Sequence, residues 1–193
     1  RDNGDNDGAI KAYGAALDLY PETDTNRWVV YYTRAIVAHD IGDWDQAESD
    51  FRAALAINPD QPQVLNYLGY SLVERGEKLD EALDMIERAV ADQPDSGAIV
   101  DSLGWVYFQL GRYDDAIDPL ERAAVLEATD PIVNDHLGDT YWAVGREREA
   151  RFQWLRAQSF EPEEDLAARI RAKLERGLDA VRQDEGQDAT RPA

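Results

Sequence analysis

Carboxylate pairs and two histidines are the side chains of this 193-residue chain whose types could support acid–base catalysis. Asp114–Asp115 and Glu163–Glu164 each stand at the start of a predicted helix, where the helix dipole favours negative charge without a catalytic role. His39 and His136 belong to segments too far apart to form an acid–base pair or a shared metal site. No phosphate-binding loop, nucleophile elbow, dinucleotide fingerprint or metalloprotease motif is present. We therefore predict no catalytic residues and no enzymatic activity.

Residues 3–14 resemble a calcium-binding loop, in which side chains at alternate positions supply oxygen ligands. Asn3, Asp5 and Asp7 have this spacing. The twelfth position of such a loop needs a bidentate glutamate, and here it is Gly14. An acidic capping turn before a helix contains the same residue types, and we favour that interpretation. We predict no bound metal and no cofactor.

The composition excludes several other classes of protein. The chain has 40 acidic and 20 basic residues and a net charge of −20, which makes nucleic acid and anionic membrane surfaces poor partners. No run approaches the roughly 18 consecutive apolar residues of a membrane-spanning helix. The absence of cysteine excludes disulfides, zinc–thiolate sites and cysteine nucleophiles, and leaves the compartment open. The chain begins at Arg1 without a signal peptide, and we interpret it as a fragment of a longer protein.

Four segments of the sequence repeat one pattern, and we place them at residues 28–61, 62–96, 97–130 and 131–164. Their starts are 34, 35 and 34 residues apart, and the extra residue of the second segment lies near Lys78. The fifteenth residue of every unit is glycine, and the eighth is small. The glycines are Gly42, Gly76, Gly111 and Gly145, and the small residues are Ala35, Gly69, Gly104 and Gly138.

These columns predict two antiparallel helices in each unit. Glycine at a fixed position fits a helix C-terminus, where the backbone adopts a positive φ. The small residues allow the two helices to approach closely, and a column of larger residues fills the space between them. Its members are Phe51, Ile86, Leu120 and Trp154. One unit cannot bury its own apolar face, so neighbouring units are expected to stack.

The sequence resembles the tetratricopeptide repeat family. The strings that carry the resemblance are YLGYSL, DSLGWVYFQLGRYDDAI and DHLGDTYWAVG, together with the repeat period. The resemblance implies an all-α protein, an α-solenoid of helix-turn-helix repeats over residues 28–162. Residues 1–27 then hold a linker and a partial repeat, whose second helix spans about residues 8–20.

Residues 163–183 are predicted to form one capping helix after the last repeat. Its apolar stripe would cover that repeat, and consists of Leu166, Ile170, Leu174, Leu178 and Val181. Basic residues lie off the stripe and are expected to face water. They are Arg169, Arg171, Lys173 and Arg176. Residues 184–193 are polar, and we expect them to be disordered.

The resemblance also implies a concave groove, lined by the second, fifth, ninth and twelfth residues of each unit. The candidate partner-binding residues at these positions are Tyr32, Asn66, Tyr70, Asp101, Trp105, Phe108, Asp135, Asp139 and Trp142. This set is aromatic and acidic without a Lys or Arg, which suits an amphipathic or basic peptide anchored on the rings. The alternative is that the rings pack between neighbouring units. We expect His39 and His136 to lie on helix surfaces.

The sequence predicts a protein–protein interaction scaffold or adaptor that binds a partner protein or peptide through this groove. The strings LNYLGYS, LDSLGW and NDHLGD, with ARIRAKLERGLDAV, resemble C-terminal repeats of long proteobacterial proteins of this family. That resemblance implies a periplasmic or outer-membrane-associated location, and delivery of substrates to a carboxyl-terminal processing protease. The alternative is a structural subunit of a larger envelope or membrane-associated assembly, held through convex or edge surfaces. The oligomeric state is left open.

Overall fold

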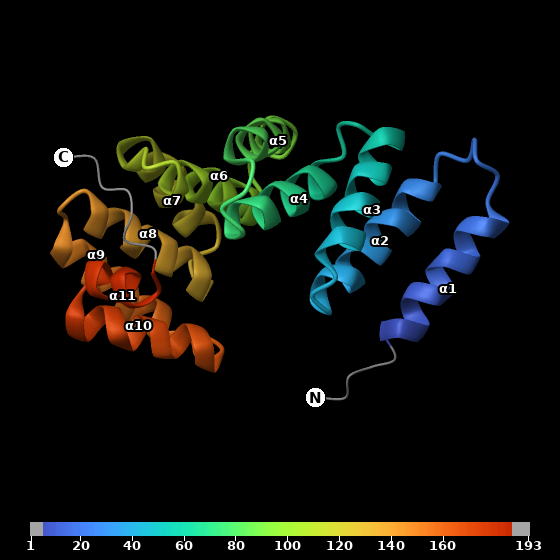
Figure 1. Cartoon of the computed structure of the whole chain (residues 1–193). Helices are drawn as coiled ribbons and strands as arrows, with labels where there is room; N and C mark the ends of the chain where they lie inside the picture. Colours follow the sequence, from blue (N-terminus) through green and yellow to red (C-terminus); the bar gives the residue numbers. More distant parts are fainter. Residues whose placement is uncertain (1–5, 187–193) are drawn as a thin grey trace. The chain divides into compact units, whose positions relative to one another are not determined.

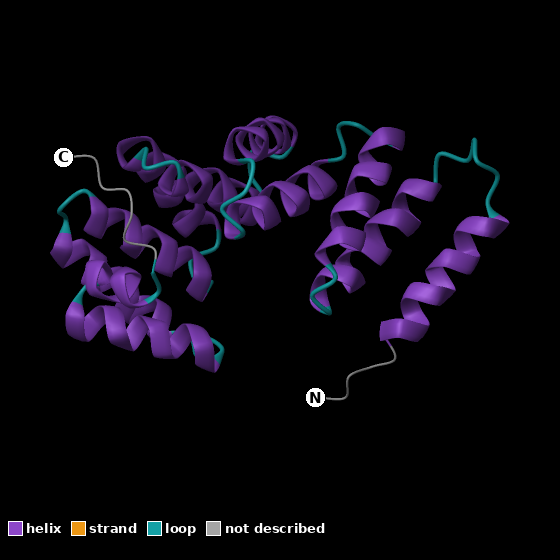
Figure 2. Cartoon of the chain, in the orientation of Figure 1, coloured by secondary structure: helices purple, strands orange, loops and turns teal. Residues whose placement is uncertain are grey.

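The computed structural model describes residues 6–186, and this part of the chain is helical with short loops (Figure 1 and Figure 2). The chain divides into two compact units between Leu68 and Gly69, inside the fourth helix. The helices are α1 (Asn6–Leu19), α2 (Arg27–Asp40), α3 (Trp44–Ile57), α4 (Pro62–Glu74), α5 (Leu79–Asp92), α6 (Gly97–Gln109), α7 (Tyr113–Leu126), α8 (Pro131–Ala143), α9 (Glu147–Ser159), α10 (Glu164–Arg176) and α11 (Leu178–Asp184). The predicted all-α class is confirmed, and each of the four predicted repeats contains two helices.

In the first unit, α1 packs on α2 and α2 packs on α3. Phe51 of α3 is fully buried, and its ring centroid lies 5.1 Å from that of Tyr67 and 6.1 Å from that of Tyr32. Arg34 of α2 donates two hydrogen bonds, of 2.6 and 2.7 Å, to the buried carboxylate of Asp50 in α3. An aromatic cluster and one bidentate ion pair therefore hold the two helices of the first repeat together.

In the second unit, each helix from α5 onward packs on the next one along the chain, as far as α11. The first helices of two neighbouring repeats, α6 and α8, also contact one another. Ile86, Leu120 and Trp154 of the large-residue column are fully buried. Within this unit, each helix pair therefore packs on the next one along the chain, as stacked helix pairs require.

Glycine turns the chain between the two helices of each repeat. The φ angles of Gly42, Gly76, Gly111 and Gly145 are +81°, +65°, +74° and +80°, so the predicted positive φ is confirmed in all four. Lys78, with a φ of 50°, precedes α5 and absorbs the extra residue of the second repeat.

The small-residue column allows the paired helices to touch. A Cβ atom at Gly104 of α6 would overlap the side chain of Leu120 in α7. Leu120 is fully buried and has no free space into which to move. A Cβ atom at Gly138 would lie 2.5 Å from the ring of Trp154 in the same way.

Replacing Gly104 with alanine should destabilise the protein, although alanine is the better helix former by about 1 kcal/mol. Overpacking a filled core costs about 1–3 kcal/mol, and the overlap with the buried Leu120 side chain places this site at the upper end of that range. After the helix gain is subtracted, we expect a net loss of about 2 kcal/mol in the free energy of unfolding. Gly14→Ala is the matched control, because a Cβ atom there lies 3.6 Å from Arg34, an ordinary contact. Urea unfolding measures both variants. A Gly104→Ala protein as stable as the parent would contradict the close-approach argument.

The C-terminal segment does not form the single capping helix that the sequence predicts. Gly177 interrupts it with φ 83° and ψ 162°, and separates α10 from α11. Ile170, Leu178 and Val181 of the predicted apolar stripe are buried. The stripe was therefore recognised correctly at these positions, but it is divided between two helices.

Two predictions fall partly beyond residues 6–186. Asn3 and Asp5 of the calcium-like segment lie outside the described residues, and residues 6–14 begin α1. Most of the predicted disordered tail also lies outside the described residues, whereas α11 includes Asp184. Within residues 6–186, no cluster of His, Asp or Glu is placed to hold a metal ion. No helix in the same range combines the length and hydropathy that crossing a bilayer requires.

Candidate functional site

The nine candidate groove residues are divided between the two units. In the first unit, Tyr32 is half-buried beside Phe51 and Tyr67, and Asn66 has a buried side-chain oxygen without a hydrogen-bond partner. The other candidates lie on α4, α6 and α8 of the second unit. We use "inner face" for the residues on α6 and α8. These are Asp101, Trp105, Phe108, Asp135, Asp139 and Trp142.

The inner face is buried, partly by the repeats and partly by the chain's own C-terminal helices, so the open groove expected from the sequence is not what this part of the structure shows. Trp105 is 5% exposed, Phe108 2% and Asp135 1%. Asp101 and Asp139 are buried as well, and Trp142 is half-buried. Side chains from α10 and α11 contact several of these residues, as described below. The role of the inner face in binding a partner stays a prediction.

Lys173 of α10 anchors the C-terminal helices to α8. Its side chain has no exposed surface, and its Nζ atom lies 2.7 Å from Asp135 Oδ2 and 2.8 Å from Asp139 Oδ2. Arg169, one turn earlier, places Nη1 3.8 Å from both carboxylates. The sequence-based expectation that Lys173 and Arg169 face water is therefore wrong. The acidic inner face takes its counter-charges from this chain.

Two carboxylates share one buried lysine in this cluster. Burial raises the pKa of Asp135, and the Asp139 carboxylate raises it further, whereas the Lys173 ammonium lowers it; the net direction is upward. Asp135 Oδ1 is buried without a hydrogen-bond partner among the described residues. Burying this cluster therefore costs desolvation free energy, and the ammonium of Lys173 offsets much of that cost by pairing with both carboxylates.

His136 is buried inside the repeat stack and does not lie on a helix surface as expected. Its Nδ1 atom is 2.9 Å from Asp101 Oδ2, and its ring stacks on Trp105 with centroids 3.8 Å apart. Trp105 stacks in turn on Phe108, with centroids 4.8 Å apart, and its indole donates to Glu74 Oε1 at 2.6 Å. Tyr70 belongs to the same region, where burial, then Glu74 and Asp101, raise the pKa of its phenol. These aromatic rings pack between repeats, which was the alternative to a groove.

Stability should depend on pH through His136. Burial lowers the pKa of its imidazole, but the charge and hydrogen bond of Asp101, together with the charges of Asp135 and Glu74, raise it by more, so the folded-state pKa is above the unfolded one. The resulting stabilisation is complete below the unfolded pKa of about 6.5 and is lost as the pH rises through the folded pKa.

Urea unfolding of the parent and of His136→Gln between about pH 6 and about pH 9 checks this expectation. The stability advantage of the parent over the variant should shrink as the pH rises. An advantage that grows with pH would contradict the assigned Asp101–His136 pair.

α11 contacts two aromatic residues of the inner face, Phe108 and Trp142. The indole of Trp142 donates to Asp179 Oδ2 at 3.2 Å, and the guanidinium of Arg182 lies 5.3 Å from the ring centroid of Phe108. Leu178 and Val181 of α11 are buried. Neither Gly177 nor Arg182 was among the candidate residues. The signal that could have indicated them is a glycine within a predicted helix and the many basic residues that follow an acidic set of repeats.

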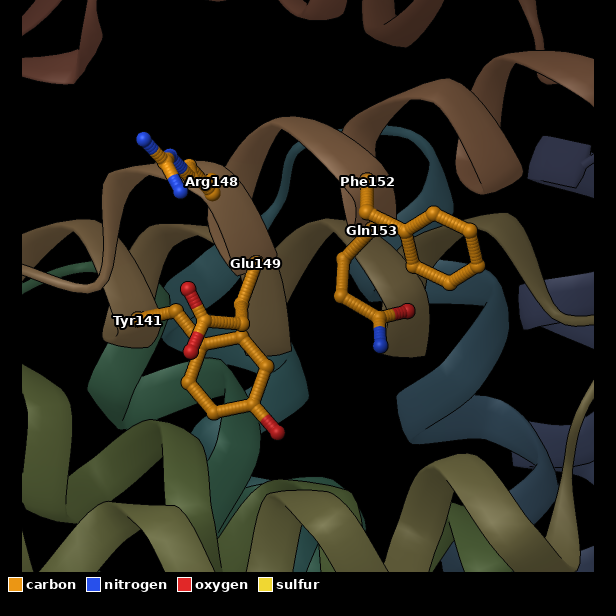
Figure 3. Close-up of a pocket in the computed structure, with 5 residues that line it drawn as sticks. All are labelled: Tyr141, Arg148, Glu149, Phe152 and Gln153. Atoms are coloured by element: carbon orange, nitrogen blue, oxygen red, sulfur yellow. The ribbon is translucent and has the colours of Figure 1, made fainter.

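A separate hollow lies on the outer side of the last repeat. It is lined by Tyr141 of α8 and by Arg148, Glu149, Phe152 and Gln153 of α9 (Figure 3). Phe152 is 60% exposed there, although it is large and apolar. Burial, then the hydrogen bond to Glu121, raises the pKa of Tyr141 to about 12, so its phenol stays protonated and donates to Glu121 Oε1 at 2.7 Å.

Comparisons with known proteins agree with this repeat structure. Residues 28–61 and 71–131 each match the tetratricopeptide repeat family. The TPR repeat-containing protein PA4667 of Pseudomonas aeruginosa is 39% identical over 110 residues, which are 55% of this chain and 18% of that protein. This chain therefore spans less than a fifth of that relative.

Solved structures are similar over most of the chain. TTC0263, a thermophilic TPR protein of Thermus thermophilus, is 25% identical with a TM-score of 0.69, covering 89% of this chain and 91% of that one. MamA of Desulfovibrio magneticus RS-1 is 19% identical with a TM-score of 0.70, covering 84% of this chain and 89% of that one. The helix pairs, the positive-φ glycines and these matches show that the chain has an α-solenoid fold and contains tetratricopeptide repeats.

Proposed function

We propose that this chain is a protein-binding scaffold that captures a helical segment of a partner polypeptide on its inner face, without catalytic activity of its own. Stacked repeats present extended binding surfaces of this kind. The polar groups that converge in the second unit hold one helix on another. Lys173, Asp135 and Asp139 are all fully buried, so they do not form the accessible site that catalysis requires.

The observation that carries the proposal is a helix already seated on the inner face. α11 buries Leu178 and Val181, and places Arg182 over the ring of Phe108. An amphipathic helix laid on aromatic rings, with an arginine over one of them, is a recurring mode of peptide recognition. The chain thus displays on itself the kind of ligand that the aromatic and acidic residues were expected to bind.

The finer part of the proposal concerns location and role. We propose a periplasmic or outer-membrane-associated adaptor that delivers substrates to an envelope protease. The likeness of the repeat strings to envelope proteins of this family supports this role. Fractionation of source cells tests the location. Recovery with cytoplasmic markers would contradict it.

A second function, as a structural subunit of a larger assembly, is favoured by apolar side chains exposed on the outer helices. Val125 of α7 is 79% exposed, and Phe152 and Leu155 of α9 are 60% and 55% exposed. Exposed apolar groups of this size often mark contact surfaces. In this alternative the partner binds α7 and α9, and the inner face stays closed.

Site-specific photo-crosslinking in source cells distinguishes the two functions. A photoreactive residue replaces Ile132, an inner-helix position that is 45% exposed, or Phe152 on the outer side. The scaffold proposal expects a defined crosslinked protein from position 132 and little from position 152. A crosslinked protein from position 152 alone would favour the structural subunit and contradict the proposal.

A further inference from the structure

We infer that α11 is a displaceable ligand held within the chain, and that the partner helix reaches the inner face of α6 and α8 by replacing it. This inference rests on the proposed function and adds the regulation of the site and the side-chain pattern of the partner. α10 and α11 are attached to the repeats in different ways.

α10 is locked to the repeats. Lys173 and Ile170 have no exposed surface, and Lys173 bonds two buried carboxylates of α8. Detaching α10 would break both ion pairs of Lys173 and would expose the buried side chain of Ile170 to water, which is unfavourable. α10 is therefore part of the fold.

α11 is held by much less. It has seven residues, of which only Leu178 and Val181 are buried. Two ion pairs join its C-terminal end to α10. The side chains of Arg176 and Asp184 are 47% and 63% accessible, and those of Arg169 and Glu185 are 28% and 33% accessible. Ion pairs that remain in contact with water typically contribute little to stability. A seven-residue helix is also unstable without its packing surface. Local opening of α11 therefore requires far less free energy than unfolding of the repeats.

Gly177 is the joint at which α11 can open. Its φ of 83° and ψ of 162° turn the chain sharply after α10. A Cβ atom at this position would lie 2.5 Å from the ring of Trp142, so glycine permits the seated position. Glycine also has the backbone freedom to adopt other directions, so α11 can leave while α10 stays in place.

The side chains of α11 define the chemistry of the partner. When α11 leaves, the ring of Phe108 loses its arginine and the indole of Trp142 loses its acceptor. A partner that matches α11 is an amphipathic helix with two aliphatic residues three positions apart. A carboxylate directly after the first aliphatic residue accepts a hydrogen bond from Trp142, as Asp179 does, and a basic residue directly after the second lies over Phe108. Leu178, Asp179, Val181 and Arg182 have this pattern.

Because α11 is tethered to α10, a partner must bind the inner face with high affinity in order to displace it. A segment joined by a short linker has an effective concentration of the order of millimolar, so a short free peptide competes poorly with α11. A longer partner helix that adds contacts beyond α11 has the advantage. The closed state therefore excludes weak ligands and admits strong ones.

Thiol reactivity tests whether α11 opens by itself, because the chain contains no native cysteine. Leu178→Cys in α11 and Ile170→Cys in α10 are matched single-cysteine variants of the full chain, at sites that are 1% and 0% exposed. Under native conditions, the thiol at position 178 should react with a disulfide reagent at least about tenfold faster than the thiol at position 170. Equal rates would show that α11 opens only with its neighbours, and would overturn the inference.

Peptide binding tests the second half of the inference. The full-chain variant Leu178→Asp/Val181→Asp releases α11, and circular dichroism checks that its repeats stay helical. A synthetic peptide with the sequence of residues 177–186 is the probe, and the same peptide with both aliphatic residues replaced by aspartate is its control. The indole N–H signal of Trp142, identified with Trp142→Phe, reports binding by NMR.

The released variant should bind the probe at least about tenfold more tightly than the parent, and the control peptide should not bind. A folded released variant that binds neither peptide would overturn the inference, and so would equal binding by parent and variant. Photo-crosslinking from position 132 reports on the proposed function independently. Crosslinks without peptide binding would leave the scaffold standing and remove α11 as its regulator.

Discussion

Replacing Lys173 with methionine should lower the free energy of unfolding by about 3–5 kcal/mol, the typical cost of removing one partner from a buried ion pair. Methionine keeps much of the apolar stem and removes the charge. Asp135 and Asp139 would then remain buried, and the guanidinium of Arg169, whose Nη1 lies 3.8 Å from each carboxylate, would not replace the two short bonds of Lys173. The loss would fall on the attachment of α10 to α8. Urea unfolding followed by circular dichroism measures it.

Two further variants control this experiment. Arg171→Met removes a neighbouring cation whose partner Glu164 is 82% exposed, so the expected loss is below about 1 kcal/mol. Adding Asp135→Asn and Asp139→Asn to Lys173→Met removes the uncompensated charges and should recover much of the lost stability. A Lys173→Met protein as stable as Arg171→Met would contradict the buried cluster.

The penalty of Lys173→Met should also shrink as the pH falls from about 7 to about 5. The lysine is the group that lowers the pKa of Asp135, so its loss raises that pKa further above the unfolded value. The folded variant then binds more protons than its unfolded state, and acidification stabilises it relative to the parent. A penalty that grows on acidification would show that the carboxylates do not carry the cost.

Replacing Trp154 with alanine should cost about 3–5 kcal/mol of unfolding free energy, because it empties a large, fully buried site in the last repeat. The indole fills the space that Gly138 leaves between α8 and α9. It also donates a hydrogen bond to Asp139 Oδ1 at 2.9 Å, and its ring centroid lies 5.4 Å from that of Trp142. The substitution therefore removes core volume and one support of the Lys173 cluster.

Phe152→Ala is the matched control for Trp154→Ala, two residues away on the same helix. Phe152 is 60% exposed, so its truncation should change stability by less than about 0.5 kcal/mol. Chemical unfolding of both variants separates the buried from the exposed side of α9. Similar losses in the two variants would place Trp154 outside the core and refute the repeat register.

The sequence predicts the repeats well because each repeat carries its own local signals. The turn glycines and the small residues recur at the same positions of each repeat. They are required by the local backbone conformation and by the close approach of the paired helices, so they can be identified without knowledge of long-range contacts. Positions such as Gly111 and Gly104 therefore predict both the turn and the close helix approach correctly. The buried column that contains Leu120 and Trp154 follows from the same register.

The C-terminal helices were predicted less well because their positions depend on contacts far along the chain. The sequence pattern of α10 alone predicts that Lys173 faces solvent, and only the fold brings this residue to Asp135 and Asp139. Gly177 lies inside a helical pattern, and its role depends on the ring of Trp142. The inner face was identified from family spacing, but that spacing could not show that the chain's own segment occupies it.

The contact of α11 with Trp142 is the structural feature on which the proposed regulation depends. Paramagnetic relaxation enhancement measures how close α11 lies to this residue. A spin label on Gln183→Cys, an exposed α11 position in a chain with no native cysteine, would lie on the helix that contacts Trp142. The label should broaden the indole N–H signal of Trp142, and chemical reduction of the label should restore that signal. A Trp142 signal that stays sharp with the active label would show that α11 is not on the inner face, and the account would be wrong.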